Sequence, residues 1–331
     1  MRIVTTRDTN VRRAVVATTL ILLVLTPFSS RAQPKGVPRI GVLWPNPPAT
    51  FEFVRQGLTE LGYVEGRNVS FEYRWAQDKL GLLPDLATEL VQLKVDLIVT
   101  LAPQATLAAM NATQTIPIVF VAMGDPVASG VIASLARPGG NVTGTTRMIS
   151  EMSGKHVEFL KQAVPGLSRL AILWNPLNSS HVPALGAARS AAHSLSIRVQ
   201  ALEVREVADL NGVFAAMVRE RADGVLFIAD PIFFIHLGRM AELIAAARLP
   251  AVCNFTEFPK LGGLIGYAPS LPDEFRRVAT HIDKILKGAK PGDLPVQQPT
   301  SFDLVINLKT AKALGLTIPP SLLLRATQVI E

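Results

Sequence analysis

Short polar and aromatic turns follow several apolar segments of this 331-residue chain, and they hold the side chains best suited to binding a small molecule. Asp125, Asp230 and Glu257 offer carboxylates that can receive an ammonium group. Trp44 and Tyr267 offer rings that can stack on an apolar or aromatic body. This combination predicts a site for a small charged or zwitterionic molecule.

Amides and helix starts complete the candidate set. Asn46 and Asn175 follow Trp44 and Trp174 at matching positions, and Trp174 offers a further ring for stacking. Several of the turns lead straight into helices, whose first N–H groups favour a carboxylate. The predicted ligand-binding residues are Trp44, Asn46, Gln104, Thr106, Asp125, Thr145, Asn175, Asp230, Glu257 and Tyr267. Each also has an ordinary structural interpretation, since Asp-Pro starts turns and a tryptophan can fill a domain interface.

Three landmarks recur in the same order about 130 positions apart, and this repeat predicts two similar domains. The segment 39–44 matches 169–174, the segment 96–103 matches 223–231, and the segment 139–145 matches 262–268. Repeats at this spacing are too long for a solenoid. Two such domains would face each other across a cleft.

Apolar runs alternate with helical periods, as in a parallel, doubly wound sheet with right-handed crossovers. The predicted strands are 39–44, 68–73, 96–100, 116–122, 141–146, 169–174, 197–203, 223–228, 250–254, 263–267 and 302–308. The predicted helices are 50–61, 83–93, 104–111, 130–136, 182–194, 209–220, 235–246, 272–287 and about 310–314. Ligands of open parallel sheets bind beyond the carboxyl ends of the strands, which is where the candidate turns lie. The elements after the second repeat predict three crossings between the lobes. The predicted N-terminal lobe is 38–146 plus about 272–299, and the C-terminal lobe is 147–271 plus about 300–331.

The first 32 residues read as a cleaved signal peptide: four arginines, an apolar run from Ala14 to Thr26, and Ser30-Arg31-Ala32 before the cleavage point. The alternative is a membrane anchor, but the apolar run is shorter than the roughly 20 residues that span a bilayer. Five arginines and one aspartate of this segment contribute +4 of the net charge of +7, so the mature chain carries about +3. With scattered basic residues, nucleic acid is a poor partner.

Catalytic signatures are sparse, and we expect a binding protein without enzyme activity, cofactor or metal. The sequence has no nucleophile elbow, no phosphate-binding glycine loop and no histidines at metal-ligand spacing. Cys253 is the single cysteine, which excludes an intrachain disulfide. A thiol that closes an apolar strand is more often a buried small residue than a nucleophile, although a cleft enzyme using Cys253 is a further hypothesis.

Several motifs resemble the substrate-binding components of bacterial ABC transporters, and more narrowly the branch related to tryptophan/tyrosine-type binding proteins. They span roughly residues 38–330, and the fairly specific ones are Gly62-Tyr-Val-Glu-Gly-Arg-Asn68 and Gly139-Gly-Asn-Val-Thr-Gly144. The resemblance implies a type I periplasmic binding fold with three interlobe crossings and delivery of a solute to an inner-membrane permease. One departure is Thr100-Leu-Ala-Pro103, where Leu101 replaces a glycine that family members often carry. An amino acid is the default ligand.

The sequence therefore predicts a periplasmic solute-binding protein that closes two lobes on a small molecule. The alternative is a ligand-sensing module that reports to a signalling partner. A transcription factor of related fold is disfavoured, because a leader stands where the DNA-binding helices of such proteins would lie.

Overall fold

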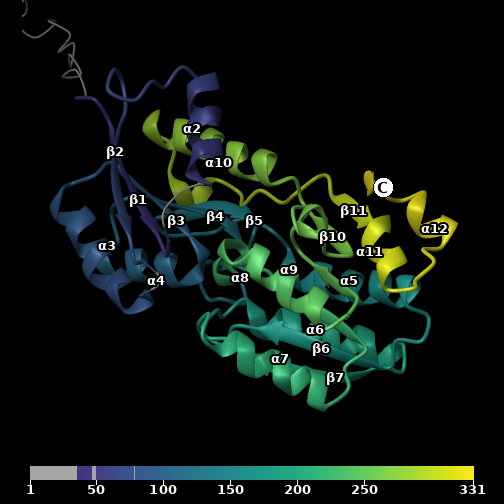
Figure 1. Ribbon diagram of the computed structural model, residues 1–331. Helices are drawn as coiled ribbons and strands as arrows, with labels where there is room; N and C mark the ends of the chain where they lie inside the picture. Colours follow the sequence, from purple (N-terminus) through teal and green to yellow (C-terminus); the bar gives the residue numbers. More distant parts are fainter. Residues whose placement is uncertain (1–35, 47–49, 78) are drawn as a thin grey trace, which may run out of the picture. The chain divides into compact units, whose positions relative to one another are not determined.

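The computed structural model describes residues 36–46, 50–77 and 79–331. The predicted signal peptide lies outside these residues. Within them, the chain forms two α/β lobes, each built on its own twisted sheet (Figure 1). The sheet of the first lobe has the order β2-β1-β3-β4-β5, and that of the second has the order β12-β11-β10-β9-β8-β6-β7.

The first lobe alternates parallel strands with helices on both faces. Its strands are β1 (Arg39–Trp44), β2 (Ser70–Trp75), β3 (Leu97–Leu101), β4 (Ile118–Met123) and β5 (Val142–Thr146). Its helices are α2 (Phe51–Glu60), η1 (Leu80–Leu82), α3 (Leu83–Gln92) and α4 (Ala102–Ala112). Alternate residues of β1 enter different cores: Ile40 and Val42 pack with α2, while Leu43 packs with α3. Burial of both faces explains why β1 is apolar from Ile40 to Trp44.

The second lobe repeats this arrangement. Its strands are β6 (Arg169–Trp174), β7 (Arg198–Glu203), β8 (Gly224–Phe227), β9 (Ala251–Cys253), β10 (Ile265–Ala268), β11 (Asp303–Asn307) and β12 (Gln328–Ile330). Its helices are α5 (Ile149–Ala163), α6 (His181–Ser194), α7 (Asp209–Arg219), α8 (Pro231–Ile235), α9 (Leu237–Ala246), η2 (Pro259–Leu261), α11 (Leu308–Ala313) and α12 (Pro320–Leu323). The strand order β7-β6-β8-β9-β10 is the same as that of the first lobe.

Matching carboxylates tie the same two strands together in both lobes. The Asp96 carboxylate accepts the N–H of Arg39 at 2.8 Å, at the start of β1. The Asp223 carboxylate accepts the N–H of Arg169 at 2.7 Å, at the start of β6, and also that of Ser168. These aspartates are the first residues of the second sequence landmark, so the repeat extends to individual hydrogen bonds.

Three segments of the described chain cross between the lobes. The first joins β5 to α5, and the second joins β10 to α10 (Leu271–Leu286), which returns to the first lobe and packs on α2, β4 and β5 (Figure 1). After η3 (Pro291–Asp293), Gln297 pairs with Thr145 of β5 before the chain crosses again to β11. Several parallel crossings favour hinge motions that open and close the lobes.

The structure differs from the sequence-based expectations in several elements. The helix predicted over 130–136 is wrong: this segment consists of turns and bends, and its first residue, Gly130, has a left-handed backbone (φ 71°). The helix predicted over 235–246 is divided, because His236 leaves helical geometry between α8 and α9. Residues 149–163, assigned to no element from the sequence, form α5, and β12 and α12 were likewise unassigned. In the otherwise parallel second sheet, β11 runs antiparallel to β10.

Candidate functional site

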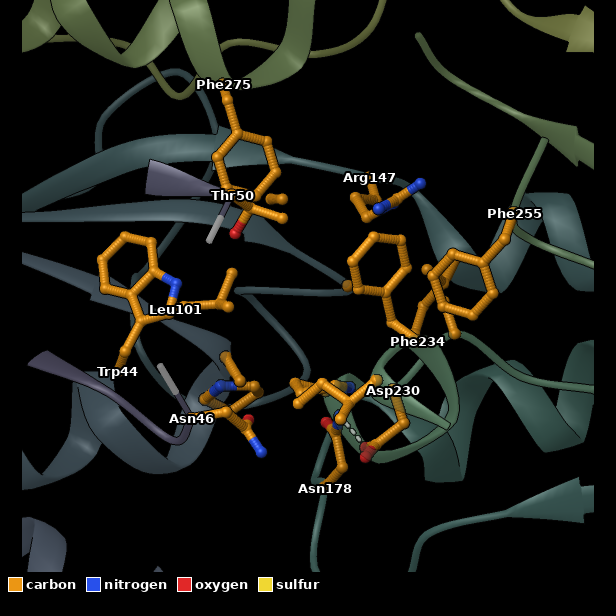
Figure 2. Close-up of a pocket in the computed structure, with 18 residues that line it drawn as sticks. Trp44, Asn46, Thr50, Leu101, Arg147, Asn178, Asp230, Phe234, Phe255 and Phe275 are labelled. Carbon is orange, nitrogen blue, oxygen red and sulfur yellow. Dashed lines mark hydrogen bonds between the residues drawn. The ribbon is translucent and has the colours of Figure 1, made fainter. Parts of the chain in front are cut away.

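A cavity of about 120 Å³ lies where the carboxyl ends of β1, β3, β4 and β8 meet between the lobes (Figure 2). On this scale one water molecule takes roughly 10–15 Å³, so the space suits a ligand of amino-acid size. Both lobes and the crossing segments contribute to the wall. The lining residues are Trp44, Asn46, Thr50, Leu101, Ala102, Pro103, Ala122, Gly124, Arg147, Ile149, Asn178, Ala229, Asp230, Pro231, Phe234, Ile235, Phe255 and Phe275.

Aromatic rings form much of this wall. Trp44, at the end of β1, packs edge-to-face on Phe51 with ring centroids 5.5 Å apart. From the second lobe, Phe234 of α8 lies against Phe255 at 5.3 Å. Phe275 reaches the cavity from the first turn of α10 (Figure 2). Such surfaces suit an apolar or aromatic ligand body, with offset or edge-on ring contacts.

Arg147 supplies a positive charge to the same wall. It follows β5 on the first crossing segment and is buried, with 7% of its surface exposed. One terminal nitrogen, Nη2, donates to the backbone oxygen of Asn254 at 3.3 Å, and the other, Nη1, lies 3.5 Å from the Glu274 carboxylate. The guanidinium also lies over the Phe255 ring, 5.8 Å from its centroid. Burial raises the pKa of Glu274 to about 7, and the attraction of Arg147 opposes that rise only in part.

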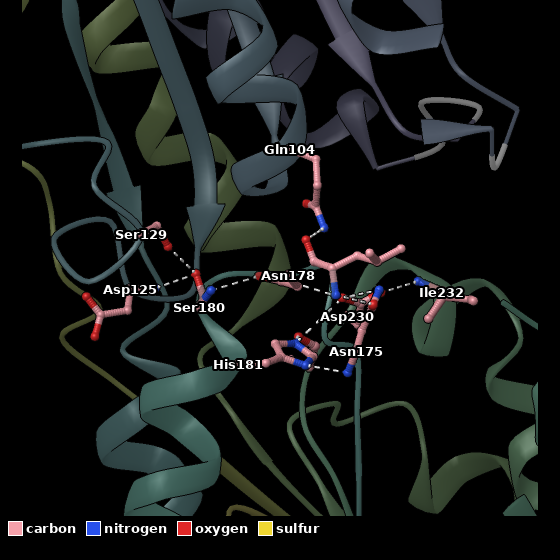
Figure 3. Close-up of polar contacts among 11 residues, drawn as sticks. Gln104, Asp125, Ser129, Asn175, Asn178, Ser180, His181, Asp230 and Ile232 are labelled. Carbon is pink, nitrogen blue, oxygen red and sulfur yellow. Dashed lines mark hydrogen bonds and ion pairs between the residues drawn. The ribbon is translucent and has the colours of Figure 1, made fainter. Parts of the chain in front are cut away.

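Asp230 stands at the opposite side of the cavity in a buried hydrogen-bond network (Figure 3). Its carboxylate caps α8 by accepting the N–H of Ile232 at 3.1 Å. It also accepts the side-chain amides of Asn178 at 2.9 Å and Asn175 at 3.3 Å. These donors satisfy most of the hydrogen-bonding capacity of this buried side chain.

His181 anchors this network from below. Its Nδ1 accepts the N–H of Asn175 at 2.9 Å, so its Nε2 carries the proton and donates to the Ala229 oxygen at 2.9 Å. Burial lowers the pKa of His181 despite Asp230 lying 3.6 Å away. A neutral imidazole in this tautomer fixes the two turns that carry Asn175 and Asp230.

The structure places three of the ten predicted residues at the cavity: Trp44, Asn46 and Asp230. Gln104 and Asn175 line an adjoining groove that shares Asn46 and Asp230 with the cavity. Gln104 donates from Nε2 to the Leu177 oxygen at 2.9 Å, which joins the two lobes (Figure 3).

Three other predicted residues support nearby backbone. The Thr145 hydroxyl accepts the N–H of Ala122, a cavity residue held in a left-handed conformation (φ 52°). The Thr106 hydroxyl bonds to the Ala102 oxygen at 3.0 Å within the core. Asp125 accepts the N–H of Ala128 at 2.9 Å and so closes its own turn. Their side chains lie outside the lining described above.

Tyr267, Glu257 and Trp174 also lie away from the cavity lining of the described chain. Tyr267 stacks on Phe302 with centroids 5.6 Å apart and joins the core of the second lobe. Trp174 packs against the same core but does not line the cavity, whereas its counterpart Trp44 belongs to the core of the first lobe and also lines the cavity. Glu257 lies on the loop between β9 and η2. The repeat therefore predicts equivalent strand ends but does not make both tryptophans cavity residues.

Several lining residues were not among the sequence candidates: Thr50, Arg147, Asn178, Phe234, Phe255 and Phe275. Phe275 lies on the apolar face of the helix predicted over 272–287, and such a position indicates packing in the core. The cavity is continuous with that core. Arg147 directly follows the strand predicted over 141–146, and its position at a strand end is the sequence signal that could have identified it as a site residue. Cys253 is buried, and burial raises the pKa of its thiol well above the ordinary value, which disfavours the reactive thiolate.

The fold is that of type I periplasmic binding proteins. The family model for ABC transporter substrate binding proteins matches residues 46–330, and the chain belongs to this family. No helix in the described part of the chain combines the length and apolarity needed to span a membrane.

Individual relatives agree with this assignment. A tyrosine-binding protein of Clostridioides difficile is 24% identical over 261 residues, which cover 79% of this chain and 75% of the relative. A conserved domain protein from Vibrio cholerae superposes with a TM-score of 0.83 at 28% identity, covering 88% of this chain and 99% of the other. An ABC domain from Streptococcus pneumoniae in complex with L-Trp gives a TM-score of 0.82 at 25% identity, with the same coverage.

Proposed function

We propose that this protein is the solute-binding component of an ABC importer and works in the periplasm after its signal peptide is removed. The observation that carries the proposal is the cavity between the carboxyl ends of two duplicated sheets, lined by residues from both lobes. A ligand in this position contacts both lobes at once. Its binding energy therefore favours the closed arrangement, which an inner-membrane permease can distinguish from the open one.

We propose an amino acid with an aromatic side chain as the ligand. Trp44, Phe234, Phe255 and Phe275 provide ring contacts, while Arg147 and Asp230 provide charges of opposite sign. A zwitterion with an aromatic body matches this lining. The relatives described as binding tyrosine and L-Trp support the same class of ligand.

Closure of the lobes is the proposed mechanism. The Ser180 hydroxyl of the second lobe accepts the N–H of Asp125 at 3.1 Å and shares a hydrogen bond with Ser129 at 2.9 Å (Figure 3). Together with the bond from Gln104 to Leu177, these contacts join the lobes beside the cavity. We expect them to break on opening and to form again around the ligand. No catalytic step is part of the proposal.

The test is thermal melting of the mature protein with tyrosine, tryptophan, phenylalanine, leucine and, as a control, ribose. Ligand at 100 times its Kd adds about 2.7 kcal/mol, which corresponds to a rise in Tm of a few degrees. We expect the aromatic amino acids to raise Tm and ribose to leave it unchanged. Absence of a shift with every aromatic amino acid would refute the proposed ligand.

Small-angle scattering tests closure separately. A saturating ligand should reduce the radius of gyration, and an unchanged scattering curve with a bound ligand would eliminate the closure mechanism. The alternative, a sensing module for a signalling partner, predicts the same cavity. Neighbouring genes for a permease and an ATPase favour import, and a neighbouring receptor or kinase gene favours sensing.

A further inference from the structure

Two buried hydrogen-bond donors of the cavity have no acceptor among the described residues: Nε1 of Trp44 and Nε of Arg147. Trp44 is 1% exposed and Arg147 is 7% exposed, and both line the cavity. In Figure 2 the nitrogen edge of the Trp44 indole is turned toward the interior beside Leu101. Because buried donors are nearly always paired in folded proteins, these two point to acceptor groups on the ligand.

Arg147 keeps unused donors as well as its charge. A guanidinium has five N–H groups, and that of Arg147 contacts the Asn254 oxygen and the Glu274 carboxylate. The Glu274 contact, at 3.5 Å, is longer than a charge-assisted hydrogen bond, and neither oxygen of Glu274 has a hydrogen-bond partner in the described chain. Arg147 is thus held in place from both lobes without having its donors saturated.

In contrast to Arg147, Asp230 has most of its hydrogen-bonding capacity occupied by protein groups. Its two oxygens already accept hydrogen bonds from Ile232, Asn175 and Asn178, and His181 lies close by. A carboxylate offers about four lone-pair positions, so few remain for a ligand ammonium. The cavity is therefore better prepared to receive a negative group than a positive one.

We propose that Arg147 is the specificity-determining anchor for a ligand carboxylate, and that the site selects aromatic acids whether or not they carry an amino group. This inference rests on the proposed function, since it assigns the recognition element within the same cavity. Arg147 lies on the crossing segment between β5 and α5, so the carboxylate of the ligand lies beside this segment. The aromatic body then extends along Trp44 and Phe234.

Calorimetric titration of the mature protein with three matched probes tests this assignment. The probes are L-tyrosine, 3-(4-hydroxyphenyl)propionate, which lacks the amino group, and L-tyrosinamide, which lacks the carboxylate. We expect the propionate to bind within about tenfold of tyrosine, since Asp230 has little capacity left. We expect the amide to bind roughly 10- to 100-fold more weakly, because it loses a charge-assisted hydrogen bond.

Variants assign the effect to Arg147. Arg147→Gln should weaken tyrosine and the propionate by the same roughly 10- to 100-fold and leave the amide little changed. Arg147→Lys retains the charge and should recover part of the loss. Arg276→Gln is the matched control: Arg276 is half-buried on α10, pairs with Glu60 and Asp273, lies outside the cavity lining, and its loss should leave all three affinities unchanged.

The outcomes separate this inference from the proposed function. Tyrosinamide binding as tightly as tyrosine to the wild-type protein, or full tyrosine affinity in Arg147→Gln, would overturn the anchor while leaving an aromatic amino acid as the ligand. A propionate that binds more than 100-fold more weakly than tyrosine would show that the ammonium dominates recognition, and also overturns it. Failure of all three probes to bind, together with failure of tryptophan and phenylalanine, rejects the proposed ligand and this inference with it. The wild-type comparison stands even if a variant does not fold.

Discussion

Raising the pH from about 4.5 to about 7 should cost this protein stability at one identifiable group, the buried carboxyl of Glu274. Burial on the first turn of α10 raises its pKa from 4.5 to about 7, with Arg147 opposing the rise. A shift of this size corresponds to about 3 kcal/mol at 1.36 kcal/mol per pKa unit. Folding thus favours the protonated carboxyl, whereas the unfolded chain loses the proton near its ordinary pKa.

The sign follows from proton counting. Below pH 4.5 both states are protonated and Glu274 costs nothing. Between 4.5 and 7 the unfolded state releases its proton while the folded state keeps it, so the free energy of unfolding falls as pH rises. Above pH 7 the full destabilisation from burying the Glu274 carboxyl is present. Glu274→Gln, a permanently neutral isostere, should therefore gain about 3 kcal/mol relative to the wild type between pH 4 and pH 8.

Urea unfolding at pH 4, 5, 6, 7 and 8 measures this difference. Working with the difference between variant and wild type is necessary, because His156 has the opposite dependence. Burial lowers its pKa to about 4, so its contribution is lost as pH falls from 6.5 toward 4. Asp273→Asn, which removes an exposed carboxylate from the same helix turn, is the matched control. If the Glu274→Gln difference does not change with pH, the assignment of Glu274 as a buried acid that destabilises the fold is refuted.

Three further predictions concern the scaffold around the site. Gly144→Ala should destabilise the fold by about 3 kcal/mol or more in urea unfolding, because its Cβ would lie 2.0 Å from the backbone oxygen of Phe120; a wild-type midpoint would contradict this. Gln104→Ala removes the hydrogen bond to the Leu177 oxygen. It should weaken ligand affinity about 2- to 10-fold in calorimetry and change Tm little. An unchanged Kd would mean that this contact does not favour closure. Asp223→Ala leaves two backbone N–H groups and one hydroxyl at the start of β6 without their acceptor and should lower the free energy of unfolding by about 2 kcal/mol; a loss below about 0.5 kcal/mol would refute that role.

Local sequence patterns determined the strands, most helices and the two-lobe organisation. The duplicated landmarks predicted two similar domains, and the structure adds that Asp96 and Asp223 each fix the start of an equivalent strand pair. These features depend on the periodicity of apolar side chains and on strands that lie close together in the sequence, and both can be recognised from the sequence alone. The helix predicted over 130–136 is wrong because a short apolar pattern does not distinguish a helix from the turns and bends that this segment forms.

Tertiary structure alone decided which strand-end residues meet. Trp44 faces the cavity while Trp174, its repeat partner, enters the core of its lobe. Arg147 and Asn254 are 107 positions apart and come together only because the chain crosses between the lobes. A strand end fixes where a residue lies, but the direction of its side chain depends on what packs against it. That packing comes from segments remote in the sequence. The two lobes could therefore be predicted from the sequence, whereas the residues that line the cavity between them could not.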